Sequence, residues 1–297
     1  MRIAVTGRTG QLVQSLLACA QAAGVTVIPI GRPELDLAQP EGVRQALANT
    51  QPDCIVNAAA YTAVDKAETE PELAMRINGE GAGAVAGAAA NLGVPLIQIS
   101  TDYVFDGMAP HPWLESDPVG PLSAYGRSKL AGEEAVAASG GDWTILRTAW
   151  VYSPYGSNFV KTMLRLADSR DEIGVVSDQL GSPTSAPDLA EAIIAVAKAL
   201  VARLDDASLR GIFHAAGAGE ASWADLAEAI FAASAKLGGP SARVRRIATS
   251  DYPTPARRPA NSRLDCSLLA ERHGLRLPPW QDSVKICVAT LLAQSRS

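Results

Sequence analysis

The sequence predicts an α/β fold in which a doubly wound parallel sheet is followed by a smaller, partly interleaved C-terminal domain. Short apolar runs alternate with longer helical patterns through the first half of the chain, which is typical of a parallel sheet covered on both faces by helices. The short runs are mostly unbroken, as expected for strands buried on both faces. After about residue 150 the loops lengthen and Pro and Arg accumulate. We therefore expect the sheet domain at 1–150, with later segments returning to it, and the smaller domain mainly at 151–297.

The expected elements follow in order from the same patterns. The first strand is expected at 3–5, and the helix after it covers 11–23. An alanine-rich segment at 72–91 predicts a tightly packed helix. The remaining expected strands lie at 25–30, 54–56, 95–100 and 143–147, and the remaining expected helices lie near 41–48, 124–139, 186–201 and 223–236.

The composition is that of a globular protein. The chain has 297 residues, of which 47% are hydrophobic and 19% charged, enough to bury a core in a large domain and a smaller one. A net charge of -5 argues against a nucleic-acid partner, because neutralising phosphates requires clustered Lys and Arg. It leaves room for a local Arg pocket that binds a small anion. The first apolar run is too short for a signal peptide, and no run reaches the roughly 18 residues of a membrane span.

Cysteine and histidine usage narrows the location and the chemistry. The four cysteines are scattered and form no C-x-x-C pair, which suits a reducing cytoplasm better than a disulfide framework. The three histidines are far apart, so no cluster of metal ligands is expected. We predict a cytoplasmic protein that binds neither a metal, a membrane nor nucleic acid.

A glycine-containing turn, Gly7-Arg8-Thr9-Gly10, comes directly after the first strand and opens the first helix. Glycines here allow the backbone to approach a pyrophosphate, while the helix N-terminus supplies free N–H groups. Val13 stands where the usual pattern has a third glycine. Such a turn also occurs without a ligand, but its place after the first strand favours a dinucleotide site in a Rossmann-type sheet. The expected cofactor contacts here are Gly7, Gly10, Gln11 and Leu12.

The ends of the next strands predict further cofactor contacts. An acidic residue after the second strand would bind the 2′-hydroxyl of NAD, whereas Arg32 suits the 2′-phosphate of NADP. We therefore expect NADPH as cofactor, with NADH possible. Asp36 and Leu37 follow closely and could flank the adenine. After the strand at 54–56, small side chains would let the cofactor lie against the backbone, with Ala60, Tyr61 and Thr62 as the expected contacts.

Tyr125 and Lys129 are the most informative pair in the chain. Residues four apart on a helix share one face, so both would point to the carboxyl edge of the sheet. A carbonyl that accepts hydride must be protonated, and Tyr is a poor acid unless a nearby cation lowers its pKa from about 10. Lys129 can supply that charge and also hold the nicotinamide ribose. Thr101, after the strand at 95–100, can donate a hydrogen bond to the substrate oxygen. The Gly7 turn and Thr101 favour catalysis over a pair of surface side chains.

This combination resembles the extended short-chain dehydrogenase/reductase family. Longer segments narrow the resemblance to the dTDP-4-dehydrorhamnose reductases over essentially the whole chain: VNAAAYTAVDKAE at 56–68, STDYVFDG at 100–107, RTAWVY at 147–152, DQLGSPT at 178–184 and PARRPANSRL at 255–264. The resemblance implies NAD(P)H-dependent reduction of the 4-keto group of dTDP-4-dehydro-L-rhamnose to dTDP-L-rhamnose. Thr101, Tyr125 and Lys129 would be catalytic, with Tyr125 as proton donor, and Thr101, Asp102 and Trp150 would contact the sugar.

The C-terminal third offers groups for the rest of a sugar-nucleotide substrate. Arg257 and Arg258 lie in a Pro-stiffened segment at 253–259, and the planar guanidinium can bind two phosphate oxygens at once. A solvated Arg pair in a surface loop is the alternative. Trp150 could pack against an apolar sugar face such as a 6-methyl group.

One departure from the family concerns a metal. Some members are described with a magnesium ion held at a dimer interface by acidic residues, one of them from the first helix. The segment 11–23 contains no Asp or Glu. We therefore predict neither that metal site nor that mode of dimerisation, and the oligomeric state stays open.

Three other functions share parts of this pattern. A sugar-nucleotide 4,6-dehydratase would need Asp-Glu straight after the Thr, but Thr101 is followed by Asp102 and Tyr103. A 4-reductase of another deoxysugar nucleotide stays open, because the sequence does not reveal which hydroxyl pattern is accepted. A non-catalytic, cofactor-binding regulatory subunit has no need of Thr101, Tyr125 and Lys129, so their presence favours an enzyme.

Overall fold

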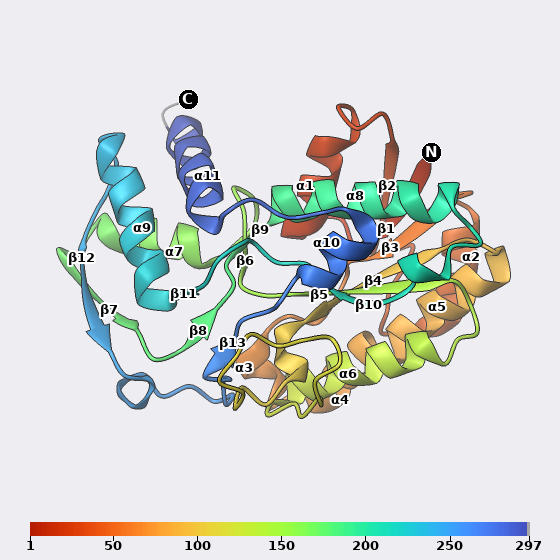
Figure 1. Ribbon diagram of the computed structural model, residues 1–297, viewed down its shortest axis with the longest axis horizontal. Helices are drawn as coiled ribbons and strands as arrows, with labels where there is room; N and C mark the ends of the chain where they lie inside the picture. The colour runs from red at the N-terminus through yellow and green to blue at the C-terminus, as the bar shows by residue number, and fades with distance from the viewer. Residues whose placement is uncertain (296–297) are drawn as a thin grey trace.

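A six-stranded parallel sheet forms the centre of the computed structural model, which describes residues 1–295 (Figure 1). Its strand order is β10-β5-β4-β3-β1-β2. The chain adds β2 on one side of β1 and the later strands on the other, so the winding reverses beside β1. The predicted doubly wound α/β fold is confirmed. The strands are β1 (Arg2–Thr6), β2 (Thr26–Ile30), β3 (Cys54–Asn57), β4 (Leu96–Thr101), β5 (Trp143–Thr148) and β10 (Gly211–His214).

Helices cover both faces of this sheet (Figure 1). One layer contains α1 (Gln11–Ala20), α8 (Ala186–Ala202) and α10 (Ser267–His273), and the other contains α2 (Val43–Ala48), α5 (Gly81–Leu92) and α6 (Ala124–Ala137). The strand β1 shows why its apolar run is unbroken. Ile3 and Val5 pack into the first layer and Ala4 into the second, and all three are fully buried.

The five predicted strands agree with β1 to β5 to within one residue at each end. The strand β10 was not expected, because its four residues begin with a glycine of positive φ and form no long apolar run. The first helix ends at Ala20, short of the predicted 23. These differences in where strands and helices end do not affect the site.

The predicted helix at 72–91 is in fact three consecutive segments: α4 (Pro71–Met75), a π-helical turn η2 (Arg76–Glu80) and α5. The extra residue of the π turn directs Asn78 inward. Its side chain accepts a hydrogen bond from the backbone N–H of Tyr61 at 2.8 Å and donates to the Tyr61 carbonyl at 3.0 Å. The turn therefore anchors the loop that follows β3.

A second group of elements packs around its own core, at the left of Figure 1. Its helices are α7 (Phe159–Ala167), α9 (Trp223–Lys236) and α11 (Trp280–Gln294), and its paired strands are β7 (Glu172–Val176) with β12 (Arg243–Ile247), β6 (Val151–Tyr152) with β9 (Thr184–Ser185), and β8 (Leu180–Gly181) with β11 (Ala221–Ser222) and β13 (Asn261–Ser262). Short segments complete the chain: η1 (Pro40–Gly42), α3 (Val64–Ala67), η3 (Asp102–Val104), η4 (Ala207–Leu209) and η5 (Thr249–Asp251).

The later elements α8, β10 and α10 lie on the large sheet rather than with this second core. We keep the division into 1–150 and 151–297 as a proposal about domains. Among residues 1–295, no helix is long and apolar enough to cross a membrane.

Candidate active site

A cavity of about 1120 Å³ opens at the carboxyl edge of the large sheet. Residues that follow β1, β2 and β3 line one part of it, and the ends of β4 and β5 line another. In open α/β sheets, ligands bind at this edge where the winding reverses. The cavity exceeds the roughly 300–1,000 Å³ of common small-molecule pockets, so it has room for two ligands side by side.

The turn after β1 has the geometry of a phosphate-binding turn. Gly7 has φ of 100°, a conformation that favours glycine, and a Cβ there would lie 3.3 Å from Val13. Val13, the departure from the three-glycine pattern, is buried in the core between α1 and the sheet. The first turn of α1 contains no acidic residue, so the positive end of its dipole is not offset there. The predicted residues Gly7, Gly10, Gln11 and Leu12 all line the cavity.

Two arginines line the cavity near this turn. Arg32 lines it with an exposed side chain, and Arg8 lies close by, with its Cγ 3.3 Å from where a Cβ on Gly31 would be. Arg8 also pairs with Glu34. Arg8 was not predicted, although its place inside the glycine turn is a signal. The other predicted cofactor residues that line the cavity are Asp36, Leu37, Ala60 and Thr62.

Tyr61 is the predicted cofactor residue that does not line the cavity. Its hydroxyl donates a hydrogen bond to Glu70 at 2.7 Å. Asn78 binds its backbone, so both the hydroxyl and the backbone of Tyr61 are held by residues outside the cavity lining. The run of small residues before Tyr61, at 58–60, contains no local signal for these contacts.

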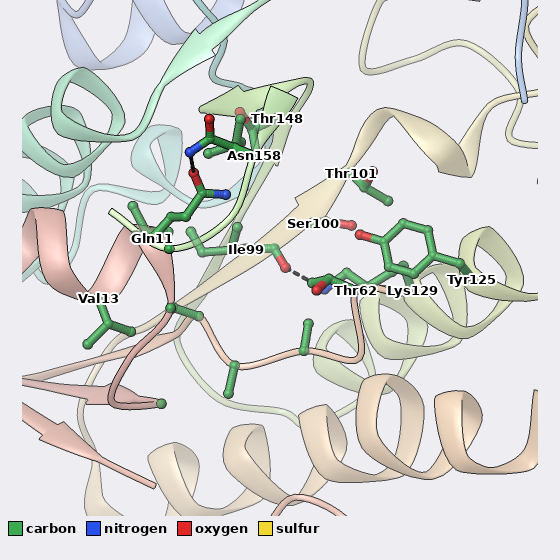
Figure 2. A pocket seen from close by; sticks show the side chains of 18 of the residues that line it. Gln11, Val13, Thr62, Ile99, Ser100, Thr101, Tyr125, Lys129, Thr148 and Asn158 are labelled. Atoms are coloured by element: carbon green, nitrogen blue, oxygen red, sulfur yellow. Dashed lines mark hydrogen bonds between the residues drawn. The ribbon is translucent and has the colours of Figure 1, made fainter. Parts of the chain in front are cut away.

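Tyr125, Lys129 and Thr101 come together at one side of the cavity (Figure 2). The α6 helix that carries Tyr125 begins at an N-cap, Ser123, whose hydroxyl accepts from the Gly126 N–H at 3.1 Å. A Cβ on Gly126 would lie 2.3 Å from the Tyr103 carbonyl oxygen, so glycine lets the start of α6 press against η3. This contact sets Tyr125 beside the end of β4.

The pKa values of the two groups are set mainly by their burial. Burial raises the pKa of Tyr125 to about 12, against a lowering influence of Thr101. Burial also lowers the pKa of Lys129 to about 8, against a raising influence of Glu133. The Lys129 ammonium donates to the carbonyl oxygen of Ile99 at 2.7 Å (Figure 2). The predicted lowering of the Tyr125 pKa by Lys129 is therefore not found, because desolvation dominates at both groups.

Asp102 is the most unusual polar side chain in the cavity wall. It is 2% exposed, its Oδ1 accepts from the Thr101 hydroxyl at 3.0 Å, and its Oδ2 has no hydrogen-bond partner. Burial raises the pKa of Asp102 to about 6. The hydroxyls of Ser100 and Thr148, at the ends of adjacent strands, are also buried without partners and line the cavity. Unsatisfied buried polar groups of this kind mark a place for a ligand.

Aromatic side chains from three segments form another part of the cavity wall, the aromatic wall. Trp150 stacks on Trp223 with ring centroids 3.6 Å apart, and Phe159 lies 4.8 Å from Trp223. All three line the cavity. Trp150 has φ of 48°, and Gly181 of the DQLGSPT segment makes room for its ring, since a Cβ there would lie 2.3 Å from it. Trp223 and Phe159 were not predicted, because their contact with Trp150 spans distant parts of the chain.

The two predicted arginines of the C-terminal third are separated. Arg258 lines the cavity and pairs with Asp65 at 2.7 Å. Arg257 is exposed and outside the cavity lining.

A polar link joins the two sides of the cavity (Figure 2). The side-chain oxygen of Gln11, at the start of α1, accepts from Asn158 at 2.9 Å and from the Ser153 hydroxyl at 3.0 Å. Asn158 also caps α7 by accepting from the Lys161 N–H at 3.2 Å. The first helix of the large sheet is thereby fixed to the loop that begins the second core.

Comparisons with known proteins agree with this arrangement. The family model described as RmlD substrate binding domain matches residues 1–293. A protein of Sinorhizobium fredii named dTDP-4-dehydrorhamnose reductase is 52% identical over 296 residues, which covers 100% of this chain and 99% of that protein.

Two solved structures are also similar. A dTDP-4-dehydrorhamnose reductase of Clostridium acetobutylicum is 39% identical with a TM-score of 0.89, covering 98% of this chain and 100% of that one. A dTDP-4-dehydrorhamnose reductase of Bacillus anthracis, solved in complex with NADP, is 36% identical with a TM-score of 0.88, covering 97% and 99%.

Proposed function

The chain belongs to the RmlD family, that of the dTDP-4-dehydrorhamnose reductases, and from this premise we propose that it reduces the 4-keto group of dTDP-4-dehydro-L-rhamnose to dTDP-L-rhamnose. The observation that carries the proposal is the grouping of Tyr125, Lys129 and Thr101 at one side of a cavity large enough for a dinucleotide and a sugar nucleotide. Beside them, Ser100, Thr148 and Asp102 present polar atoms without partners.

The residues present fit a nicotinamide dinucleotide phosphate. Gly7 and the start of α1 form a cradle that side chains would fill, and Arg32 and Arg8 lie where the second strand ends. Guanidinium groups there suit a 2′-phosphate. We therefore propose NADPH as the cofactor, with NADH possible. When bound, it would supply the hydride for C4 of the sugar. The proposed contacts, all in the cavity lining, are Gly7, Gly10, Gln11, Leu12, Arg32, Asp36, Leu37, Ala60, Thr62, Tyr125 and Lys129.

Tyr125 supplies the proton in this proposal. A phenol with a pKa of about 12 keeps its proton at neutral pH, and it can give that proton to the more basic oxygen that forms when hydride reaches the carbonyl carbon. Lys129, which lines the same side of the cavity, would hold the nicotinamide ribose hydroxyls with its ammonium. The Thr101 hydroxyl binds the same substrate oxygen once it turns from Asp102.

The aromatic wall and Arg258 would hold the rest of the substrate. Trp150 offers an apolar ring to the sugar face, and Asp102 is placed to bind a sugar hydroxyl. Arg258 carries a positive charge toward the cavity for the diphosphate. The roles of Tyr61 and Arg257, and the cytoplasmic location, stay predictions from the sequence.

The test is to offer the purified protein NADPH and a panel of keto-sugar nucleotides while following the absorbance of reduced nicotinamide. We expect dTDP-4-dehydro-L-rhamnose to give the highest kcat/KM. A higher kcat/KM with another 4-keto sugar nucleotide would mean that the substrate is that other deoxysugar nucleotide. Binding of NADPH with no turnover of any of them would favour a regulatory subunit.

A further inference from the structure

A buried ion pair lies behind the cavity and is not part of its lining. Arg147 on β5 donates from Nε and Nη2 to the two carboxylate oxygens of Glu133 on α6, at 2.9 and 2.6 Å. The two side chains are 3% and 4% exposed. Because desolvating two charges can cost more than their attraction returns, stability alone does not account for such a pair. Its surroundings suggest another role.

Glu133 is a near neighbour of Lys129. The two are four residues apart on α6 and therefore share one face of the helix. Glu133 forms its ion pair with Arg147 and not with Lys129. The Lys129 ammonium instead donates to Ile99 on β4 at 2.7 Å and lines the cavity. Ile99 precedes Ser100, the residue that pairs with Arg147 across the β4–β5 register.

We propose that Glu133 and Arg147 are positioning residues for the reduction: Arg147 fixes the Glu133 carboxylate behind Lys129, so that Lys129 stays a charged ammonium directed into the cavity. This inference rests on the proposed function, in which Lys129 acts as a cation. A free carboxylate at this spacing would pair with the lysine directly and draw its ammonium away from Ile99. The bidentate contact with Arg147 prevents that movement while the negative charge remains close.

The charges around Lys129 agree with this role. Burial lowers the pKa of Lys129 to about 8, and Glu133 opposes that lowering. Without the carboxylate, the ammonium would lose its proton at a lower pH. The other titratable groups on α6 and on the elements packed against it are Tyr125, Arg127 and Glu134 on α6 itself, Asp102 and Tyr103 on η3, Arg147 on β5, Asp65 and Lys66 on α3, Glu72 on α4, and Arg76 and Glu80 on η2.

The test is the alkaline limb of the pH profile of kcat in Glu133→Gln. We expect this limb to move to lower pH by about 1 unit. The lost negative charge would make the Lys129 ammonium less stable, and the effective dielectric of a protein interior keeps this change modest. The variant would then be roughly fivefold slower than the wild type at pH 8 and almost equal at pH 6. A pair that serves only stability would lower Tm and leave the limb in place.

Glu133→Gln leaves the Arg147 charge buried without a partner and could prevent folding. The double variant Glu133→Gln/Arg147→Met removes both charges and should therefore fold. Its alkaline limb should shift in the same direction but by less, because the positive charge of Arg147 is lost as well. The matched control is Asp142→Asn. It breaks the bidentate pair of Arg210 with Asp142, at 2.9 and 2.8 Å, which lies at the amino end of β5 and outside the cavity lining. Its alkaline limb should coincide with that of the wild type.

A second readout separates this inference from the proposed function. The affinity for NADPH, followed by quenching of tryptophan fluorescence, should fall as the pH rises. In Glu133→Gln this fall should occur at a lower pH than in the wild type, whether or not any sugar nucleotide is reduced. Absence of turnover with that shift present would count against the proposed substrate and still support the pair. Folded single or double variants with wild-type limbs in both readouts would overturn the inference.

Discussion

At the scale of single residues, the phenol of Tyr125 has the most specific role. Tyr125→Phe should bind NADPH normally and lose about 10²–10⁴-fold in kcat, because general acid catalysis contributes that much. The natural control is Tyr103→Phe. Tyr103 also lines the cavity, and its ring lies 5.5 Å from that of Tyr125, so loss of its hydroxyl tests for a general effect on packing. NADPH oxidation under saturating substrate measures both. A Tyr125→Phe variant as fast as Tyr103→Phe would remove Tyr125 from the mechanism.

Arg32 is expected to decide between the two nicotinamide cofactors. Arg32→Ala should raise KM for NADPH by about 10- to 150-fold, the worth of a charge-assisted hydrogen bond, and leave KM for NADH nearly unchanged. Arg8→Ala should have a smaller effect in the same direction, because Glu34 already engages that guanidinium. Steady-state kinetics with each cofactor measure the difference. Equal losses with NADPH and NADH would mean that Arg32 only shapes the loop.

Asp102 should destabilise the unliganded protein at neutral pH. Burial raises its pKa from 3.8 to about 6, so the native state takes up a proton that the unfolded state releases. The stability linked to this group is therefore present below about pH 4 and is lost as pH rises through about 6. Asp102→Asn, which carries no charge, should be more stable than the wild type by up to about 3 kcal/mol at pH 7 and by little at pH 4. Urea unfolding at the two pH values tests this, and an equal difference at both would rule out the titration of Asp102 as its source.

At the scale of elements, the contact between α6 and η3 sets the position of the proton donor. Gly126→Ala would place a Cβ 2.3 Å from a backbone oxygen of Tyr103, which cannot move aside as a side chain can. We expect a loss of about 1–3 kcal/mol in the free energy of unfolding and a lower kcat, since Tyr125 must shift with the helix. Gly87→Ala on α5 is the control, because nothing lies within 4 Å of its added Cβ. It should gain roughly 0.5–1 kcal/mol. A neutral Gly126→Ala would show that the contact is not tight in solution.

The elements also show how far the sequence determines the structure. Strands buried on both faces, such as β1, have a local signature, so β1 to β5 were predicted to within one residue. The π turn at η2 has no such signature, because the partners of Asn78, Tyr61 and Ser128, come from other segments. The site divides in the same way. Tyr125 and Lys129 follow from helical spacing, whereas Trp223 meets Trp150 only through the tertiary fold.

Neighbouring residues can also differ in ways that no local pattern reveals. Arg257 and Arg258 are indistinguishable in sequence, yet Arg258 faces the cavity because Asp65 on α3 holds it, and Arg257 is exposed. Tyr61 was grouped with Ala60 and Thr62, but its hydroxyl is taken by Glu70. In each case, a partner on another element decides where the side chain lies.

At the scale of the whole molecule, the cavity belongs to both cores. Gln11 binds Asn158 across one side of it, and Asp65 binds Arg258 across another, so residues before 150 and after it meet at both places. A cofactor held by the sheet edge and a sugar nucleotide held by the aromatic wall would meet beside Tyr125. The reaction that we propose is therefore a hydride transfer between these two ligands.

That transfer can be followed directly with NADPH deuterated at both C4 positions of the nicotinamide. Mass spectrometry of the product formed from dTDP-4-dehydro-L-rhamnose should find one deuterium on the sugar, at C4, for each NADPH oxidised. Oxidation of the cofactor that leaves the sugar unlabelled, or no conversion of this sugar nucleotide while NADPH is bound, would contradict the account.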